Sequence, residues 1–310
     1  SDTYEEAVAV LNGMGVFKGY EDGSFQPQGN ITRAEVAAIV YRVYTADVKD
    51  AKASLYATYN KFSDMTGAGW AQGYIGYCAN AALVKGYPNG TFQPSGKVTG
   101  YEVLTMILRA IGYDKNNEFS GADWALHVAQ TAQQAGVLDN VKGVDLNAPA
   151  TRELVAELLF RAIAVAPMVT YTAAFGYQTV SFDTKKDNKF FKDNETLGHK
   201  NFLLDSDVDA DAWGRPTTVW FEDADKDLKH DDSETVYATI TATPDASFNV
   251  ATTECDICAA LGVKKSADVV EIYTNGVKKG TDTLTATEAK AKLGAQGQHG
   301  VRSMRFLAMK

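Results

Sequence analysis

The sequence predicts a multidomain α + β protein whose first half is all-helical and whose second half is rich in strands. A nine-residue string at residues 19–27 returns 67 residues later, with apolar residues at helical spacing on either side of each copy. From about Pro167 the composition changes to alternating β-branched and aromatic segments. The 310 residues are enough for two ordinary domains, each with its own core.

The repeated string has the pattern G-Y-x-[DN]-G-[ST]-F-Q-P and recurs at residues 86–94. Thr32 returns as Thr99 at the same offset of 67 residues. A third, degenerate copy follows, because Trp124 precedes Thr151 much as Trp70 precedes Thr99. We therefore expect modules at residues 1–48 (truncated at its N-terminus), 60–114 and 118–166.

Each copy is predicted to form a helix, a loop and a second helix. The apolar residues 7–11 begin the first helix, and glycine and proline punctuate the loop. Thr32 with Glu35, and Thr99 with Glu102, are capping boxes, and apolar residues follow them at i, i+3, i+4 and i+7. One such hairpin cannot bury its apolar face alone, whereas three can close around a shared bundle of second helices.

Together these motifs resemble three tandem S-layer homology modules. The resemblance covers residues 1 to about 165 and is carried by Phe62-Ser63-Asp64, by Trp70, by the repeated loop string and by Ile31-Thr32-Arg33-Ala34-Glu35. It implies a pseudo-threefold all-α trimer whose grooves bind a secondary cell-wall polysaccharide, often pyruvylated, that is linked to peptidoglycan. It also implies a protein secreted to the bacterial cell wall or S-layer.

Arginines at the helix starts are the leading candidates for the capture of an acidic sugar. Arg33 and Arg152 follow the capping threonines, where free backbone N–H groups and a guanidinium fork suit a carboxylate. The polysaccharide-binding candidates are Thr32, Arg33, Glu35, Asp64, Trp70, Thr99, Tyr101, Asp123, Trp124, Thr151 and Arg152. The alternatives are a surface ion pair for Arg33, packing for the two tryptophans and helix capping for Asp64.

The three grooves are expected to be unequal. The second copy has Gly100 where the resemblance implies a basic residue, and the third has Thr151-Arg152-Glu153-Leu154 with a loop two residues shorter. We expect Arg33 and Arg152 to contribute to binding and Gly100→Ala to do little, with Tyr101 able to stack on a sugar.

The second half, residues 168–310, is predicted to be a β-rich assembly domain. Strands are expected at residues 169–172, 217–221, 235–241 and 269–274, with a hairpin turn at Asn275-Gly276. Short helices are expected at residues 253–261 and 287–293, and a polar loop or extension at 183–195. This domain is expected to self-associate in a surface lattice.

Two constellations in this half carry possible chemistry. Asp223, Asp225, Asp227, Asp231 and Glu234 occupy positions 1, 3, 5, 9 and 12 of a calcium loop, with Leu228 in place of the usual glycine at position 6. Calcium is the one candidate cofactor, against an exposed acidic connection between strands. Cys255 and Cys258 favour a structural disulfide or buried thiols over a zinc or redox site.

Composition and charge exclude several classes of function. Residues 1–167 carry 13 basic and 17 acidic side chains and the remainder 17 and 22, so no basic excess indicates nucleic-acid binding. No apolar run reaches the ~18 residues of a membrane span. The chain begins at Ser1 with neither Met nor a signal peptide, as a mature or trimmed segment would.

We expect a structural anchor and not an enzyme, since no pair of catalytic carboxylates or activated nucleophile is evident. The alternatives are an extracellular polysaccharide hydrolase that carries the modules as its anchor, and a tether between an outer membrane and peptidoglycan.

Overall fold

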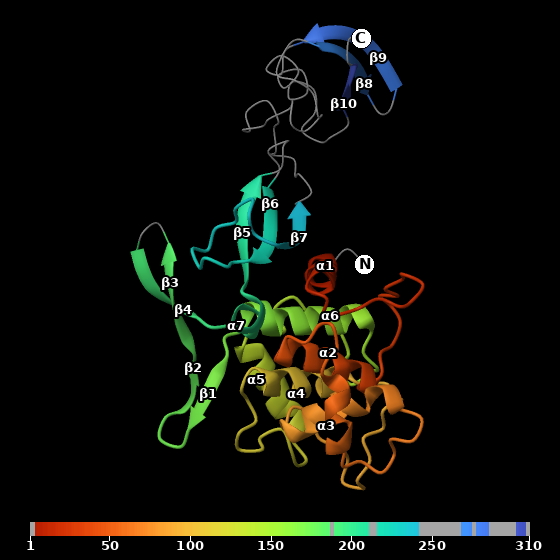
Figure 1. The fold of residues 1–310 in the computed structure, drawn as a ribbon, viewed down its shortest axis with the longest axis vertical. Helices are drawn as coiled ribbons and strands as arrows, with labels where there is room; N and C mark the ends of the chain where they lie inside the picture. Colours follow the sequence, from red (N-terminus) through yellow and green to blue (C-terminus); the bar gives the residue numbers. More distant parts are fainter. Residues whose placement is uncertain are drawn as a thin grey trace. The chain divides into compact units, whose positions relative to one another are not determined.

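The computed structural model describes residues 4–186, 189–210, 216–241, 268–274, 277–284 and 302–307 (Figure 1). It contains both helices and sheets, which confirms the predicted α + β class. The chain divides into two compact units. One comprises Ser1–Ser206 with Trp220–Ala238, and the other comprises Asp207–Val219 with Thr239–Lys310.

The repeat region of the first unit is helical, as predicted. Its elements are α1 (Glu5–Gly13), α2 (Arg33–Thr45), the 3₁₀ segments η2 (Ala53–Tyr59) and η3 (Gly69–Ala71), α3 (Gln72–Asn80), α4 (Gly100–Ala110), α5 (Trp124–Gln134) and α6 (Arg152–Phe160), which continues as the π-turn η4 (Arg161–Val165). The second helices α2, α4 and α6 each bury nine residues, more than the other described helices, and α4 contacts both of the others (Figure 1).

The first helix of each copy packs against the second helix of a different copy. Helix α3 packs on α2, α5 packs on α4, and α1 packs on α6. Each amphipathic helix therefore buries its apolar stripe on a neighbouring repeat and not on its own.

The capping threonines start the second helices at the predicted positions. The Thr32 hydroxyl accepts from the Glu35 N–H, and the Glu35 carboxylate accepts from the Thr32 N–H at 2.8 Å. Thr99 and Glu102 form the same reciprocal box. In the third copy Thr151 caps through the Leu154 N–H only, because a leucine replaces the glutamate of the box.

The helix starts and loops of different copies are joined by main-chain hydrogen bonds. Each helix start donates to the loop of the next copy: Arg33 N–H to Gly96 O at 2.9 Å, Tyr101 N–H to Leu146 O at 3.1 Å, and Arg152 N–H to Gly29 O at 2.8 Å. Isolated bridges lie beside these bonds at Thr32 with Lys97, Thr99 with Pro149 and Asn30 with Thr151. The contacts run from copy one to two, two to three and three to one.

Two antiparallel hairpins and a short helix complete the chain up to Ser206. Strand β1 (Val169–Thr172) pairs with β2 (Gly176–Thr179), β3 (Ser181–Lys186) pairs with β4 (Lys189–Asn194), and α7 (Leu197–Phe202) follows. The prediction of a loop or extension at residues 183–195 was wrong. Strand β3 buries Phe182 in part and Thr184 fully, but a threonine and the charged residues around it do not form an apolar alternation in the sequence.

The remaining strands form two sheets of three strands each. Strands β5 (Leu204–Ala210), β6 (Pro216–Glu222) and β7 (Val236–Thr241) are in the order β5-β6-β7. Strands β8 (Asp268–Thr274), β9 (Val277–Leu284) and β10 (Arg302–Leu307) are in the order β10-β8-β9, with Thr274 opposite Val277.

The strands predicted at 169–172, 217–221, 235–241 and 269–274 are therefore confirmed to within a residue. The Asn275-Gly276 turn, the helices expected at 253–261 and 287–293, and Cys255 with Cys258 lie outside the described residues.

Candidate functional site

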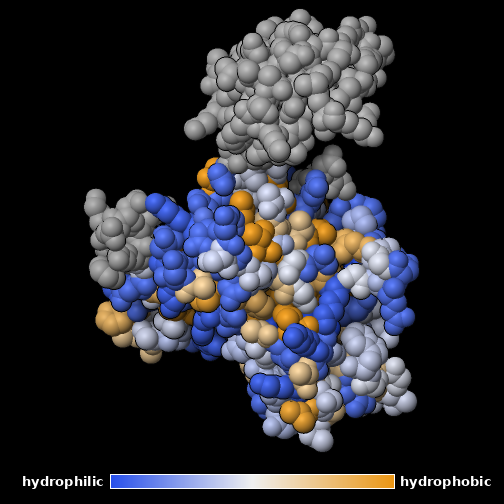
Figure 2. Space-filling model, turned by 45° about the horizontal axis from the view of Figure 1, so that its top comes forward, coloured by the Kyte–Doolittle hydropathy of each residue, from blue (hydrophilic) through white to orange (hydrophobic). Residues whose placement is uncertain are grey.

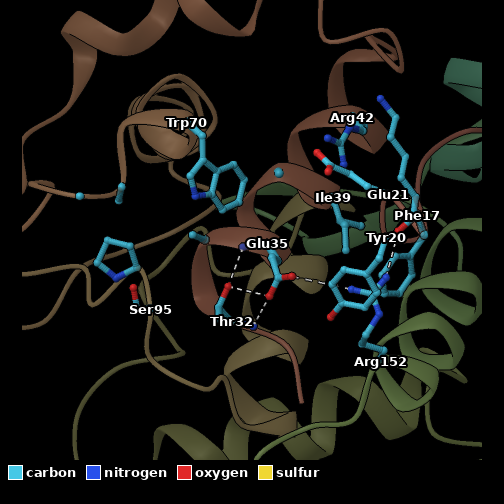
Figure 3. A pocket seen from close by; sticks show the side chains of 17 residues that line it. Phe17, Tyr20, Glu21, Thr32, Glu35, Ile39, Arg42, Trp70, Ser95 and Arg152 are labelled. Carbon is cyan, nitrogen blue, oxygen red and sulfur yellow. Dashed lines mark hydrogen bonds and ion pairs between the residues drawn. The ribbon is translucent and has the colours of Figure 1, made fainter. Parts of the chain in front are cut away.

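An open groove of about 670 Å³ lies beside helix α2 in the repeat region. Its walls come from all three copies. Residues 17–21 and helix α2 belong to the first copy, Trp70 and Pro94 to the second, and Arg152 to the third. Figure 3 shows the Trp70 indole on one side, Tyr20 and Arg152 on the other, and Glu35 between them.

Arg152 extends from the start of α6 into the loop of the first copy. Its Nε donates to Phe25 O at 2.8 Å and its Nη2 to Lys18 O at 2.9 Å, while the guanidinium lies 4.5 Å from the centroid of the Tyr20 ring. Its Nη1 lies 3.8 Å from Glu35 Oε1, a longer separation than a hydrogen bond. The Arg152 side chain is 4% exposed, so this nitrogen, which forms no hydrogen bond within the described part of the chain, is the part of Arg152 left for a ligand in the groove.

Arg33 is held more completely by the loop of the second copy. Its Nε donates to Phe92 O at 2.8 Å, its Nη2 to Lys85 O at 3.3 Å and its Nη1 to Glu102 at 2.8 Å. The Arg33 side chain is 5% exposed and that of Glu102 is 19% exposed, so Arg33 forms an ion pair, but a part-buried one and not one on the surface. All three terminal donor groups of Arg33 are engaged within the protein.

The expectation of free backbone amides beside these arginines was wrong. The N–H groups of Arg33 and Arg152 donate to the carbonyls of Gly96 and Gly29, and that of Ala34 donates to Pro94. Closure of the repeats uses these N–H groups, which sequence patterns within a single copy cannot reveal.

Glu35 and Arg42 give the groove both signs of charge. Glu35 Oε2 accepts from the Thr32 N–H and hydroxyl, each at 2.8 Å, which leaves Oε1 toward Arg152. Arg42 and Lys18 both pair with Asp50, each at 2.7 Å. Burial raises the pKa of Asp50, but the hydrogen bonds and charges of Arg42 and Lys18 outweigh it and lower the pKa below the usual value.

The sequence reasoning missed Lys18, Tyr20 and Arg42 as lining residues of the groove. The signal was present in the repeat, because all three recur 67 residues later, as Lys85, Tyr87 and Arg109. Lys85 and Arg109 pair with Asp114 in the second copy as Lys18 and Arg42 pair with Asp50 in the first. Recurrent charged residues outside the loop string would therefore have identified this part of the site.

Asp64 fixes the loop of the second copy and does not cap a helix. Its two carboxylate oxygens accept from the N–H groups of Phe92 at 2.8 Å and Gln93 at 2.7 Å. Burial acts to raise the pKa of Asp64, but these backbone hydrogen bonds dominate and lower it. The helix-capping alternative was wrong, and the contact of Asp64 with sugar hydroxyls stays a prediction.

The equivalent region between the second and third copies contains Thr99, Tyr101 and Trp124. The Tyr101 ring lies edge-on to Trp124, with centroids 6.3 Å apart. Trp124 is half-buried, whereas Trp70 is 58% exposed. Asp123 is exposed and precedes α5 without a side-chain capping bond.

Gly100 is buried against the shortened loop of the third copy. A Cβ at this position would lie 2.7 Å from Leu146 Cδ2 and 3.1 Å from Leu146 Cα. Gly100→Ala is therefore expected to disturb the local packing, because the main chain of Leu146 resists the added methyl group, while its small effect on binding stays a prediction.

The third interface, where Thr151 caps α6, is acidic. Glu153 and Glu157 of α6 occupy the repeat positions of Ala34 and Ala38 in α2. Glu157 is 3% exposed and accepts from Asn140 at 2.9 Å. Burial raises the pKa of Glu157, and the charge of Glu6 adds to the rise.

The acidic loop after β6 brings together three of the five predicted calcium ligands. Carboxylate oxygens of Asp223, Asp225 and Asp227 lie within 4.8 Å of one another. Asp231 instead accepts from Ser233, and Glu234 accepts from the N–H groups of Ala224 and Asp231. Leu228 adopts φ +61° without being a glycine. Calcium binding here stays a prediction.

On the face that Figure 2 shows, apolar residues of the described part form small patches among polar ones. No helix among the described residues is long and apolar enough to cross a membrane.

Comparison with known proteins finds one matching domain family and several similar proteins. Residues 1–37 and 61–104 match the S-layer homology domain. The chain is 34% identical to the middle cell wall protein of Brevibacillus brevis over 110 residues, which are 36% of this chain and 10% of that protein. It is 39% identical to the cellulosome-anchoring protein of Acetivibrio thermocellus over 92 residues, 30% of this chain and 20% of that protein.

An amylopullulanase of Thermoanaerobacterium thermosulfurigenes is 32% identical over 108 residues, 34% of this chain and 6% of the enzyme. The matches therefore span a small part of each of these relatives. They confirm the predicted resemblance and the predicted place at the cell surface.

Proposed function

We propose that the three repeats, residues 1–166, anchor the chain by binding an acidic secondary cell-wall polysaccharide. The proposal rests on the match to S-layer homology domains and on the similarity to cell-wall proteins. The observation that carries this proposal is the open groove with an exposed Trp70 on one wall and Arg152 on the other. An indole face suits a sugar ring, and a guanidinium suits the carboxylate of an acidic substituent such as a pyruvyl ketal.

The three copies act in this proposal as one pseudo-threefold body. Its support is the cyclic set of contacts, in which each second helix starts within the loop of the next copy. Arg33 and Arg152 hold these junctions together, and Arg152 has the further role of facing the ligand.

The ligand carboxylate approaches Arg152 Nη1, whose ion pair within the described part of the chain is the 3.8 Å contact with Glu35. Glu35 is held by its hydrogen bonds to Thr32, at 3.8 Å from Arg152. It therefore orients Arg152 but does not form a close ion pair with it. Sugar rings next to the carboxylate extend across the groove toward Trp70.

The second half of the chain is proposed to self-associate in the surface lattice. An anchored enzyme remains the second candidate because a relative is named amylopullulanase, although the match covers 6% of that protein. The polysaccharide proposal is favoured because the groove belongs to the repeats themselves.

Substitution of Trp70 tests the proposal. Trp70→Ala should weaken binding to purified wall polysaccharide about tenfold, because the loss of a central aromatic contact costs on the order of 1–2 kcal/mol. Phe175→Ala is the matched control, since Phe175 is 76% exposed and lies outside the groove.

Calorimetry with polysaccharide fragments, before and after removal of their acidic substituents, measures both effects. Equal affinity of the Trp70 variant and the unmodified chain would reject the groove. Equal binding of the neutralised polymer would reject the role of Arg152.

A further inference from the structure

We infer that the chain contains a second groove for the same acidic polysaccharide, between its second and third copies, which the Tyr101 side chain closes. The inference rests on the proposed function of the open groove. It concerns which residue limits the number of binding sites in this chain.

The second groove has the same polar residues as the open one. At the 67-residue offset, Lys85, Tyr87, Glu102 and Arg109 correspond to Lys18, Tyr20, Glu35 and Arg42. The third copy contributes Trp124 where the second contributes Trp70. Arg33 enters the loop of the second copy as Arg152 enters that of the first. A ring surface and a guanidinium are thus present in both places.

The decisive difference lies at one helix position. Ala34 in the open groove corresponds to Tyr101 in the second. The methyl group of Ala34 leaves the Trp70 indole 58% exposed, whereas the Tyr101 ring packs edge-on against Trp124 at 6.3 Å. Tyr101 thus contacts the indole on which a sugar would stack, and Trp124 is half-buried where Trp70 is exposed.

A second difference predicts that the reopened groove binds more weakly. Arg33 Nη1 lies 2.8 Å from Glu102, and the same glutamate oxygen accepts from the Tyr87 hydroxyl at 2.7 Å. The matching contact in the open groove is 3.8 Å long. A ligand carboxylate must therefore compete with Glu102 for Arg33, even after Tyr101 is removed.

The test counts binding sites per chain by calorimetry, with a short acidic oligosaccharide prepared from bacterial wall polysaccharide. The unmodified chain should bind one oligosaccharide. Tyr101→Ala should bind two, the second about tenfold more weakly, while the affinity of the first site is unchanged. Tyr101→Phe, which keeps the ring, should bind one. Ala34→Tyr should abolish binding at the open groove.

The double variant Tyr101→Ala with Trp124→Ala locates the new site, because it should return the count to one. Tyr101→Ser serves as a second opening variant, and circular dichroism reports the helical fold of each protein. Two sites in the unmodified chain, or one site in folded Tyr101→Ala and Tyr101→Ser, would overturn the inference. No binding by the unmodified chain would instead reject the proposed function.

Discussion

At the scale of single residues, the two arginines act mainly as connections between repeats. Arg33 reaches two main-chain carbonyls and Glu102 in the second copy, and its guanidinium lies 4.7 Å from the rings of Tyr87 and Phe92. Arg152 makes the same kind of insertion into the first copy. The planar fork of arginine suits this mixture of carbonyl, carboxylate and ring contacts, which a lysine cannot reproduce.

Arg33→Ala should therefore reduce the stability of the helical unit. The change leaves Glu102 without its cation and the Phe92 and Lys85 carbonyls without a donor, and breaking a buried ion pair costs about 3–5 kcal/mol. Arg33→Lys should recover only part of the loss. Urea unfolding followed by circular dichroism measures both variants, with Lys49→Ala as an exposed control. A urea midpoint equal to that of the Lys49→Ala control would show that the contacts of Arg33 with the second copy do not stabilise the fold.

At the scale of elements, helix α6 differs from α2 because the positions of the buried alanines Ala34 and Ala38 hold the buried glutamates Glu153 and Glu157. Glu157 lies against the region of α1 that holds Glu6, and Glu6 accepts from the Trp220 indole at 2.8 Å. Burial raises the pKa of Glu157 in the folded protein, and Glu6 raises it further. The folded state therefore binds a proton more readily than the unfolded state does.

Glu157→Gln should stabilise the protein at neutral pH and have little effect in acid. A raised folded-state pKa contributes stability below the unfolded value of about 4.3 and loses it as the pH rises through the folded value. The glutamine keeps a partner for Asn140 without the buried charge. Thermal unfolding of both proteins from about pH 4 to 8 checks this. A pH-independent difference, or a loss of stability at pH 7, would contradict it.

At the scale of the whole molecule, the compact unit that contains the repeats also includes residues outside them. Trp220 packs against Phe160 with ring centroids 5.1 Å apart, and the Tyr237 hydroxyl donates to Phe202 O at 3.0 Å. The compact unit accordingly includes Trp220–Ala238 in addition to the chain up to Ser206. The groove, by contrast, is lined only by residues 17–152.

Truncation should separate binding from stability. Residues 1–167 should bind wall polysaccharide as tightly as the whole chain, but should unfold at least ~2 °C lower, because loss of the Trp220 contacts costs more than about 1 kcal/mol. Residues 1–241 should recover the midpoint. Sedimentation with wall material and calorimetric scans measure the two properties. Loss of binding in a folded 1–167 fragment would show that the groove depends on the second half.

The sequence alone determined the repeat, the starts of its second helices and four of the ten described strands, because these depend on local rules. Thr32 and Thr99 cap helices whatever lies around them, and alternation identifies a strand that buries one face. It missed the hairpin of β3 and β4, because the buried face of β3 is formed in part by a threonine, Thr184, among charged residues.

Only the tertiary structure decided what the site residues do. Sequence spacing placed Arg33 and Arg152 at helix starts, but their partners lie 52 to 134 residues away, in loops of other copies. The same closure engages the backbone N–H groups of both arginines and sets Tyr101 against Trp124 while Ala34 leaves Trp70 exposed. A groove between repeats is built from distant segments, so its open or closed state follows from packing and not from any local pattern.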